Sequence, residues 1–106
     1  MNIQKLMKEA QRAQQKVAEA QERLAGMTVE GSAGAGLVRA EATGDGTVTK
    51  VRIDPKVVDA DDVEMLEDLV TAAVNEAQRK AKELQEREMG AAMGGMGGLG
   101  GLGGML

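Results

Sequence analysis

The absence of aromatic residues limits this chain more than any other feature, because its 106 residues include no Phe, Tyr or Trp. Aromatic side chains normally supply the largest blocks of buried area in a protein core. A chain of this size also buries a smaller share of its surface than a larger one does. One copy folded alone is therefore predicted to be marginally stable. Burial against a second copy is the simplest remedy, so we expect a homodimer.

The chain also lacks the residue types most often used for catalysis. There is no Cys, which excludes a disulfide framework, a thiol nucleophile and a zinc–thiolate site. There is no His, which is the commonest general base and the commonest metal ligand. We therefore expect a protein that acts by binding and not as an enzyme, with no catalytic residues, no cofactor and no small-molecule substrate.

The sequence shows neither a targeting signal nor a membrane span. The first residues, MNIQKLMKEAQ, are polar and amphipathic and lack the apolar segment of a signal peptide. No run of 18 apolar residues occurs, so no segment is predicted to cross a membrane. We expect a cytoplasmic protein without a membrane partner.

Residues 2–25 are predicted to form one long helix. Their apolar positions recur at alternating steps of three and four, which gives a heptad seam held for more than three repeats. The polar positions hold Gln, Lys, Glu and Arg, which are good helix formers, and Gly26 is suited to end the helix. The seam consists of Ile3, Leu6, Ala10, Ala13, Val17, Ala20, Leu24 and Met27.

From Met27 onward the pattern becomes that of β-strands. Residues 28–30, 37–43 and 47–53 are rich in β-branched residues and are separated by glycine-rich breaks. In the second and third segments apolar and charged residues alternate, which predicts a three-stranded antiparallel sheet with one buried face. Pro55 ends the sheet because it lacks the N–H that a ladder needs. The inward residues are expected to include Val38, Ala40, Ala42, Val51 and Ile53.

A second long helix is predicted from about residue 62 to residue 89. Asp61 and Glu64 have the spacing of a capping box at its start. Two additional apolar positions widen its inward stripe in the first half, which we therefore expect to be the more buried half. The stripe consists of Val63, Leu66, Val70, Ala73, Ala77, Ala81 and Leu84, widened by Leu69 and Val74.

These elements place one domain at residues 1–89, followed by a Gly/Met/Leu-rich tail at 90–106. Much of the tail repeats Gly-Gly-apolar, and ordering so much Gly costs entropy, so we expect it to be disordered. Weak apolar contacts through its Met and Leu residues are the alternative to a passive tail. A 24-residue helix is about 36 Å long and a seven-residue strand about 23 Å, so both helices are expected to overhang the sheet as arms.

The formal net charge of −4 hides a strong polarity. Residues 1–18 hold four cations and one acid, whereas residues 54–76 hold eight acids and one Lys. At about 100° per residue, the cations of the first helix fall within roughly 80° of one another, beside the apolar seam. Such a stripe suits neutralisation of phosphates along a duplex, and an ordinary solvated face is the alternative. The stripe consists of Lys5, Lys8, Arg12, Lys16 and Arg23.

Other candidate sites are weaker. The second helix ends in a basic cluster that Glu83, Glu86 and Glu88 interrupt. No aromatic side chain is present to stack on a base, so any nucleic-acid binding is expected to address the backbone of a duplex. The glycine-rich segment 31–36 has neither a dinucleotide fingerprint nor the Lys of a P-loop, and it is interpreted as a hairpin loop. The acidic cluster is explained by caps and turns, so no metal site is expected; it consists of Asp54, Asp59, Asp61 and Asp62.

Four stretches in order and spacing resemble the YbaB/EbfC family of bacterial nucleoid-associated proteins. They are SAGAGLV at 32–38, VRIDP at 51–55, EMLEDLV at 64–70, and Ala73 with NEA at 75–77. The resemblance covers residues 1 to about 89. It implies an α+β fold with an α-β-β-β-α protomer, a three-stranded antiparallel sheet flanked by two long helices, and a tweezer-like homodimer. It also implies a location in the nucleoid.

The resemblance further implies that the helical arms bind double-stranded DNA, with possible roles in nucleoid organisation and gene expression. The basic residues of the two helices are then the DNA-binding residues. They are Lys5, Lys8, Arg12 and Lys16 in the first helix, and Arg79, Lys80, Lys82 and Arg87 in the second.

A protein-interaction module or adaptor, which uses the arms or the acidic start of the second helix without direct DNA binding, is the alternative hypothesis. Salt distinguishes the two, because binding to phosphates weakens steeply as the salt concentration rises.

Overall fold

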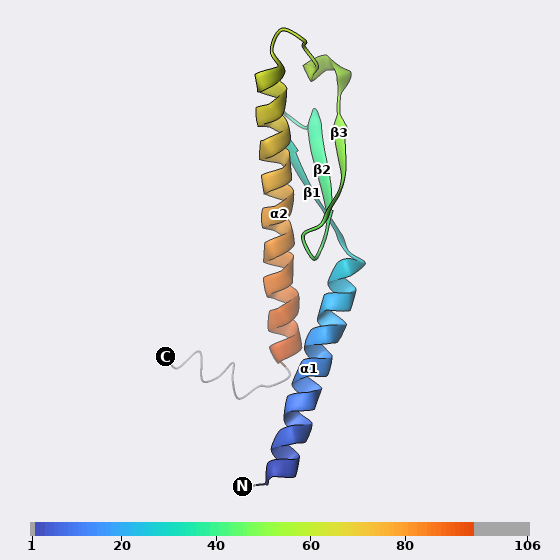
Figure 1. Cartoon of the computed structure of the whole chain (residues 1–106), viewed down its shortest axis with the longest axis vertical. Helices are drawn as coiled ribbons and strands as arrows, with labels where there is room; N and C mark the ends of the chain where they lie inside the picture. The colour runs from blue at the N-terminus through green and yellow to red at the C-terminus, as the bar shows by residue number, and fades with distance from the viewer. Residues whose placement is uncertain (1, 95–106) are drawn as a thin grey trace, which may run out of the picture.

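The computed structural model describes residues 2–94 and contains the predicted order of helix, three strands and helix (Figure 1). The tail that is predicted to be disordered comprises residues 90–106, and residues 95–106 lie outside the described range. The elements are α1 (Ile3–Ala25), β1 (Thr28–Ala33), β2 (Val38–Thr43), β3 (Val48–Ile53), the 3₁₀ turn η1 (Pro55–Val57) and α2 (Val63–Gly94).

Helix α1 has the bounds that its sequence predicts. The side chain of Asn2 caps its first turn by accepting a hydrogen bond from the N–H of Lys5 at 3.3 Å. At the other end the N–H of Gly26 donates to the carbonyl of Arg23 at 3.1 Å. No Gly or Pro interrupts the 23 residues between these ends.

The three strands form the predicted antiparallel sheet in the order β1-β2-β3. A hairpin joins β1 and β2 as predicted, with positive φ at Gly34, Ala35 and Gly36, but its loop begins at residue 34 and not at 31. Strand β1 is longer than predicted, since it continues to Ala33, which pairs with Val38. The additional residues lack a β-branched signal, and their strand conformation results from pairing with β2.

The core lies between α2 and one face of the sheet, and small residues dominate it. Val38, Ala40 and Ala42 of β2 are buried against α2, which contributes Ala73 and Ala77. At Gly31 an added Cβ atom would lie 2.3 Å from the carbonyl oxygen of Ala73 and from the nitrogen of Ala77. The backbone of α2 therefore lies so close to β1 that a side chain at position 31 would collide with it.

Three predicted core positions are wrong. Val63 is 53% exposed, because the first turn of α2 lies beyond the strands, at the level of η1 (Figure 1). Val51 and Ile53 point to the face that α2 covers, yet they are 38% and 40% exposed because α2 lies mainly over β1 and β2. The first half of α2 is the more buried half, as predicted, because Ala73 and Ala77 are buried there and only Ala81 is buried beyond it.

The ends of α2 also differ from the prediction. Asp62, and not Asp61, caps the helix, since its carboxylate accepts a hydrogen bond from the N–H of Met65 at 3.2 Å. The helix continues to Gly94, five residues beyond the predicted end, because Ala91 and Ala92 follow Gly90 and favour the helical state.

The molecule is elongated, with extents of 70 × 28 × 16 Å. Its radius of gyration is 19.7 Å, whereas a compact domain of about 90 residues has a radius of about 12 Å. The N-terminal part of α1 projects beyond every other described element, and it forms the predicted arm (Figure 1). The later half of α2 lies beside the last turns of α1 instead of standing alone.

Candidate nucleic-acid interface

The four predicted DNA-binding residues of α1 lie together on the projecting arm. All four side chains are exposed, and within residues 2–94 none of them has a carboxylate within 4 Å. Because they share one side of a continuous helix, their charges can face the same ligand. We call this set the arm cations: Lys5, Lys8, Arg12 and Lys16.

The fifth cation of the stripe has a different environment. Arg23 forms an ion pair with Glu88 of α2, with 3.4 Å between Nε and Oε2. It lies where the two helices meet, and its charge is partly neutralised there. Arg23 therefore joins the helices, whereas the arm cations face solvent.

The four predicted DNA-binding residues of α2 differ in whether they form ion pairs. Arg79 pairs with Glu83 at 3.1 Å, and Lys80 pairs with Glu76 at 3.3 Å. The ammonium of Lys80 also donates to the backbone carbonyl of Glu30 at 2.9 Å, so it fastens α2 to the edge of β1. Lys82 and Arg87 are exposed and form no ion pair within the described chain.

Glu76 completes the contact between α2 and β1. Its carboxylate accepts a hydrogen bond from the N–H of Ser32 at 3.4 Å. The side chain of Lys80 and the N–H of Ser32 both favour the charged form, and they lower the pKa of Glu76 from its ordinary value of 4.5. The outer edge of β1 is thus occupied by two side chains of α2.

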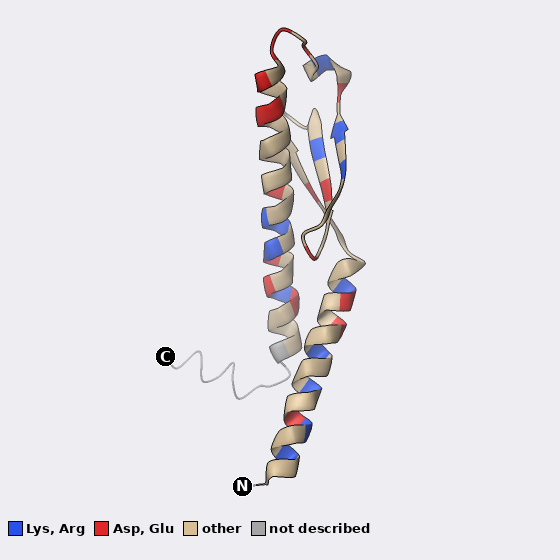
Figure 2. Cartoon of the chain, in the orientation of Figure 1, with Lys and Arg blue, Asp and Glu red and all other residues tan. Residues whose placement is uncertain are grey.

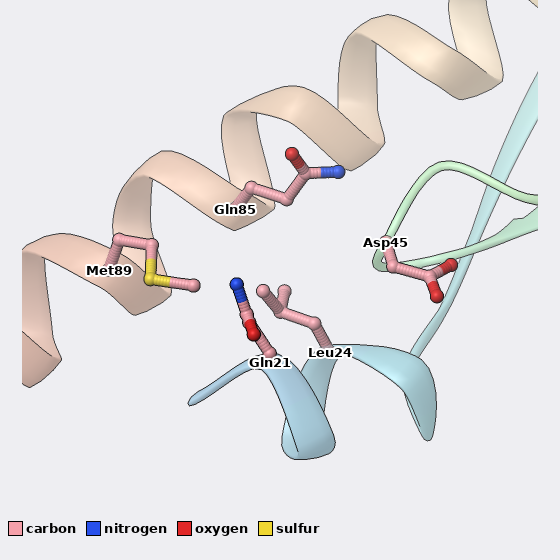
Figure 3. A pocket seen from close by; sticks show the side chains of 5 residues that line it. All are labelled: Gln21, Leu24, Asp45, Gln85 and Met89. Carbon is pink, nitrogen blue, oxygen red and sulfur yellow. The ribbon is translucent and has the colours of Figure 1, made fainter. Parts of the chain in front are cut away.

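A junction of α1, α2 and the β2–β3 turn sets the base of the arm (Figure 3). Leu24 is buried there, and the side chain of Gln85 donates to the carbonyl of Gly44 at 2.9 Å. An added Cβ at Gly44 would lie 2.5 Å from the carbonyl oxygen of Leu24, so the turn and the helix end are in close contact.

A shallow hollow of about 360 Å³ opens beside this junction and is lined by Gln21, Leu24, Asp45, Gln85 and Met89. In Figure 3 the side chains of Gln21 and Met89 approach each other, whereas the carboxylate of Asp45 points away. Hydrogen bonds from the hydroxyl of Thr43 and the N–H of Thr47 lower the pKa of Asp45, which thus serves the turn. The hollow lacks the paired acid and base of a catalytic site. This junction could not be predicted from local sequence patterns, because its residues come from three separate segments.

Three basic residues on the sheet were not among the predicted site residues. Arg39, Lys50 and Arg52 lie on the face opposite α2, and all are exposed. Figure 2 shows basic bands on both β2 and β3. The alternation of the strands contained the signal, since these cations alternate with the inward apolar residues.

The predicted acidic cluster lies at the opposite end of the molecule from the arm cations, where Figure 2 shows red on the loop before α2 and on the start of α2. The carboxylate of Asp54 accepts from the N–H of Lys56 at 2.9 Å, and that of Asp59 accepts from the N–H of Asp61 at 2.9 Å. These contacts are the turns that the sequence suggests. Across residues 2–94 the structure contains no group of three or more acidic side chains arranged to hold a metal ion.

No helix in the described part of the chain combines the length and the apolar character needed to cross a membrane.

Comparisons with known proteins identify relatives of this chain. Residues 1–96 match the YbaB/EbfC DNA-binding family. A nucleoid-associated protein of Thermus thermophilus is 55% identical over 97 residues, which cover 90% of this chain and 91% of the relative. A nucleoid-associated protein of Saccharopolyspora erythraea is 51% identical over 93 residues, covering 88% of this chain and 80% of the relative.

The fold also matches a solved structure. An uncharacterized protein from Helicobacter pylori superimposes with a TM-score of 0.73 at 17% identity, covering 82% of this chain and 91% of that chain. The extent of the family match and the identity to its relatives together show that this chain belongs to the YbaB/EbfC DNA-binding family.

Proposed function

We propose that this protein binds double-stranded DNA as a homodimer, mainly through contacts between its helical arms and the phosphate backbone. The observation that carries the proposal is the set of arm cations, four exposed positive charges on one side of a projecting helix. Membership of a DNA-binding family supports DNA as the partner. The proposed contact residues are Lys5, Lys8, Arg12 and Lys16 of α1, with Arg79, Lys80, Lys82 and Arg87 of α2.

The two helices contribute unequally to this proposal. The arm cations release counterions from DNA without first breaking an ion pair. Arg79 and Lys80 must exchange a carboxylate partner for a phosphate, so their net contribution is smaller. Lys82 and Arg87 lie between these extremes, because Glu83, Glu86 and Glu88 surround them in sequence. Binding of this kind is only weakly specific for sequence.

The proposed dimer uses the edge of the sheet that α2 leaves open. No described strand or side chain pairs with the outer edge of β3, in contrast to the edge of β1. The N–H of Asp54 donates to the carbonyl of Leu37, so the backbone groups of Asp54 point toward β2. The backbone groups of successive residues point to alternate sides of a strand, so those of Val51 and Ile53 point outward, away from β2. Val51 and Ile53 of this strand are apolar and are 38% and 40% exposed. A second copy would bury them and supplement a core of small residues.

The names of the relatives suggest where this binding matters. Proteins 55% and 51% identical to this chain are nucleoid-associated proteins. We infer the same location for this chain, and we infer that DNA binding affects nucleoid organisation and gene expression through occupancy of the duplex.

Gel-shift titrations test the DNA proposal, with two unrelated duplexes at low and moderate salt. The wild-type protein is expected to shift both duplexes, with affinity that falls steeply as salt rises. Replacement of all four arm cations by Gln is expected to abolish the shift and to leave helicity and dimer mass unchanged. The Glu9→Gln and Glu19→Gln changes remove acids from the same side of α1, and together they should strengthen binding. Retained binding by the quadruple variant would overturn the assignment of the arm.

Light scattering tests the dimer. The wild-type protein is expected to have twice the mass of one chain, and Val51→Lys with Ile53→Lys is expected to give monomers. Leu6→Lys is a matched control, because it places the same charge on an exposed apolar position of the arm. A wild-type monomer with full helicity would contradict the proposal.

An exposed apolar seam favours one alternative function, a protein-interaction module. The first residues of this seam, Ile3 and Leu6, are 70% and 48% exposed at the start of α1, and the neighbouring Met7 is 59% exposed. Such a seam is suited to packing against a helix of another protein. Absence of any gel shift at micromolar protein and low salt would favour this alternative.

A further inference from the structure

The face of the sheet opposite α2 carries two directly opposed pairs of like charges that sheet stability does not explain. Arg39 of β2 lies directly opposite Arg52 of β3, and Glu30 of β1 lies directly opposite Glu41 of β2. Like charges at directly opposed positions destabilise a sheet, whereas opposite charges stabilise it. The face thus separates a pair of arginines from a pair of glutamates along the strands.

The ion pairs on this face are diagonal and long. Arg39 lies 3.8 Å from Glu30, and Arg52 lies 3.8 Å from Glu41. These distances exceed those of hydrogen bonds, and the arginine side chains are 53% and 61% exposed. Such pairs contribute little to stability, and they leave most guanidinium N–H groups to solvent or to a ligand.

The backbone holds one of the two guanidinium groups in position. The Nε of Arg39 donates to the carbonyl of Gly36 at 3.1 Å. This bond orients the group beside a shallow hollow of about 300 Å³, lined by Gly36, Leu37, Arg39, Arg52, Ile53 and Asp54. Asp54 also lines the hollow; its carboxylate accepts a hydrogen bond from the N–H of Lys56 and keeps its negative charge. Lys50 adds a third cation one pair further along the same face, directly opposite Glu41.

We propose that Arg39 and Arg52, with Lys50 beside them, form a second contact for the DNA phosphate backbone, separate from the arm cations. Two guanidinium groups on adjacent strands are suited to one phosphodiester, because each presents paired N–H donors to its oxygens. The ligand also offsets the repulsion between the two arginines. The site rests on the proposed function and extends the DNA contact from the arm to the sheet.

The test is the salt dependence of duplex binding by the full-length protein. Arg39→Gln with Arg52→Gln is expected to weaken binding at low salt and to reduce the slope of log affinity against log salt by about one to two. Glu30→Gln with Glu41→Gln removes the opposing acids and is expected to tighten binding. Arg39→Lys with Arg52→Lys keeps the charge but removes the paired donors, so affinity should fall with little change in slope.

A matched control separates a local contact from net charge. Lys56→Gln removes one exposed cation at the acidic end, and it is compared with Arg52→Gln. We expect Arg52→Gln to reduce the slope by about one and Lys56→Gln to leave it unchanged. Equal effects of the two changes, or an unchanged slope in the arginine pair variant, would overturn the proposal. Circular-dichroism melts of each variant establish that the protein is folded.

The arm variant distinguishes failure of this site from failure of the proposed function. If the quadruple arm variant loses binding while the arginine pair variant binds like the wild type, the sheet contact is wrong and DNA binding stands. If the wild-type protein binds no duplex at low salt, both are wrong. If the arginine pair variant loses affinity and slope as expected, both are supported.

Discussion

The two helices of this protein look alike in sequence and behave differently in the structure. Each is long and uninterrupted by Pro, and each has an apolar stripe with many alanines. Helix α2 buries three alanines of its stripe along its middle, whereas α1 buries only Ala20 and Leu24, near its end. Periodicity indicates which side of a helix is apolar, but it does not indicate whether another element covers that side.

Two glycines mark where the helices are attached. Because Gly31 has no side chain, the backbone of α2 packs closely against the sheet. Because Gly44 has none, the end of α1 packs closely against the β2–β3 turn. The first contact lies in the core, and the second lies at the base of an arm. We therefore expect stability to depend mainly on α2 and its contact with the sheet, while the projecting part of α1 is available for binding.

The largest expected effect comes from closing the contact at Gly31. Gly31→Ala places a Cβ 2.3 Å from two backbone atoms of α2, so the helix must move away from the sheet. We expect a loss of about 3 kcal/mol in the free energy of unfolding, measured by circular dichroism in urea. Alanine normally stabilises a strand relative to Gly, so a loss of stability in Gly31→Ala would indicate the close contact with α2.

Gly90→Ala is the matched control for Gly31→Ala. It makes the same chemical change in α2, where an added Cβ meets no atom within 4 Å. We expect a gain of about 0.5 kcal/mol from helix propensity, reduced by fraying near the helix end. A loss of stability at Gly90, or none at Gly31, would contradict the division between covered and free surfaces.

The next largest effect is expected at the base of the arm. Leu24→Ala removes one of the two largest fully buried side chains of the described residues. We expect a loss of about 2 kcal/mol in the free energy of unfolding, since the junction has room to collapse partly. Small-angle scattering should show a broader distribution of arm positions. If scattering and stability are both unchanged, α1 does not depend on this junction for its orientation.

A smaller effect is expected for the contact between α2 and the edge of β1. The pKa of Glu76 is lowered in the folded state, so its contribution to stability is present above its ordinary value of 4.5 and is lost as the pH falls through the lowered pKa. Asp45, whose pKa is also lowered from 3.8, contributes with the same sign. We expect the melting temperature to fall as the pH is lowered from about 5 to about 3, a range that includes both ordinary pKa values. Glu76→Gln should make this profile shallower, and an unchanged profile would show that the ion pair with Lys80 is not maintained in solution.

The smallest effect is expected on the projecting part of α1. Leu6→Gln replaces an apolar side chain that is 48% exposed, so the free energy of unfolding should change by less than about 0.5 kcal/mol. Melts at several protein concentrations provide the measurement, because a dimer makes stability depend on concentration. A large loss would mean that the arm is covered in the assembled protein, and it would remove the contrast between the helices.

Local patterns predicted most of the fold. The steps of three and four along α1, the hairpin glycines at 34–36 and Pro55 each act on their immediate neighbours, so the elements could be placed without a structure. The same reasoning was wrong for Val63, Val51 and Ile53, because their exposure depends on where α2 crosses the sheet. The arm cations, in contrast, could be predicted from the local pattern, because they share a side of one helix and no distant residue is required to bring them together.

The sequence by itself determined the elements, their order, the apolar and basic sides of α1, and a core limited to small side chains. Those properties follow from spacing and composition within single segments. The tertiary structure decided which side chains are available to bind. It engaged Lys80 with the edge of β1 and Arg23 with Glu88, left the arm cations exposed, and placed Arg39 opposite Arg52. The physical reason is that ion pairs and exposure depend on distances between separate segments, which only the packing of α1, α2 and the sheet sets.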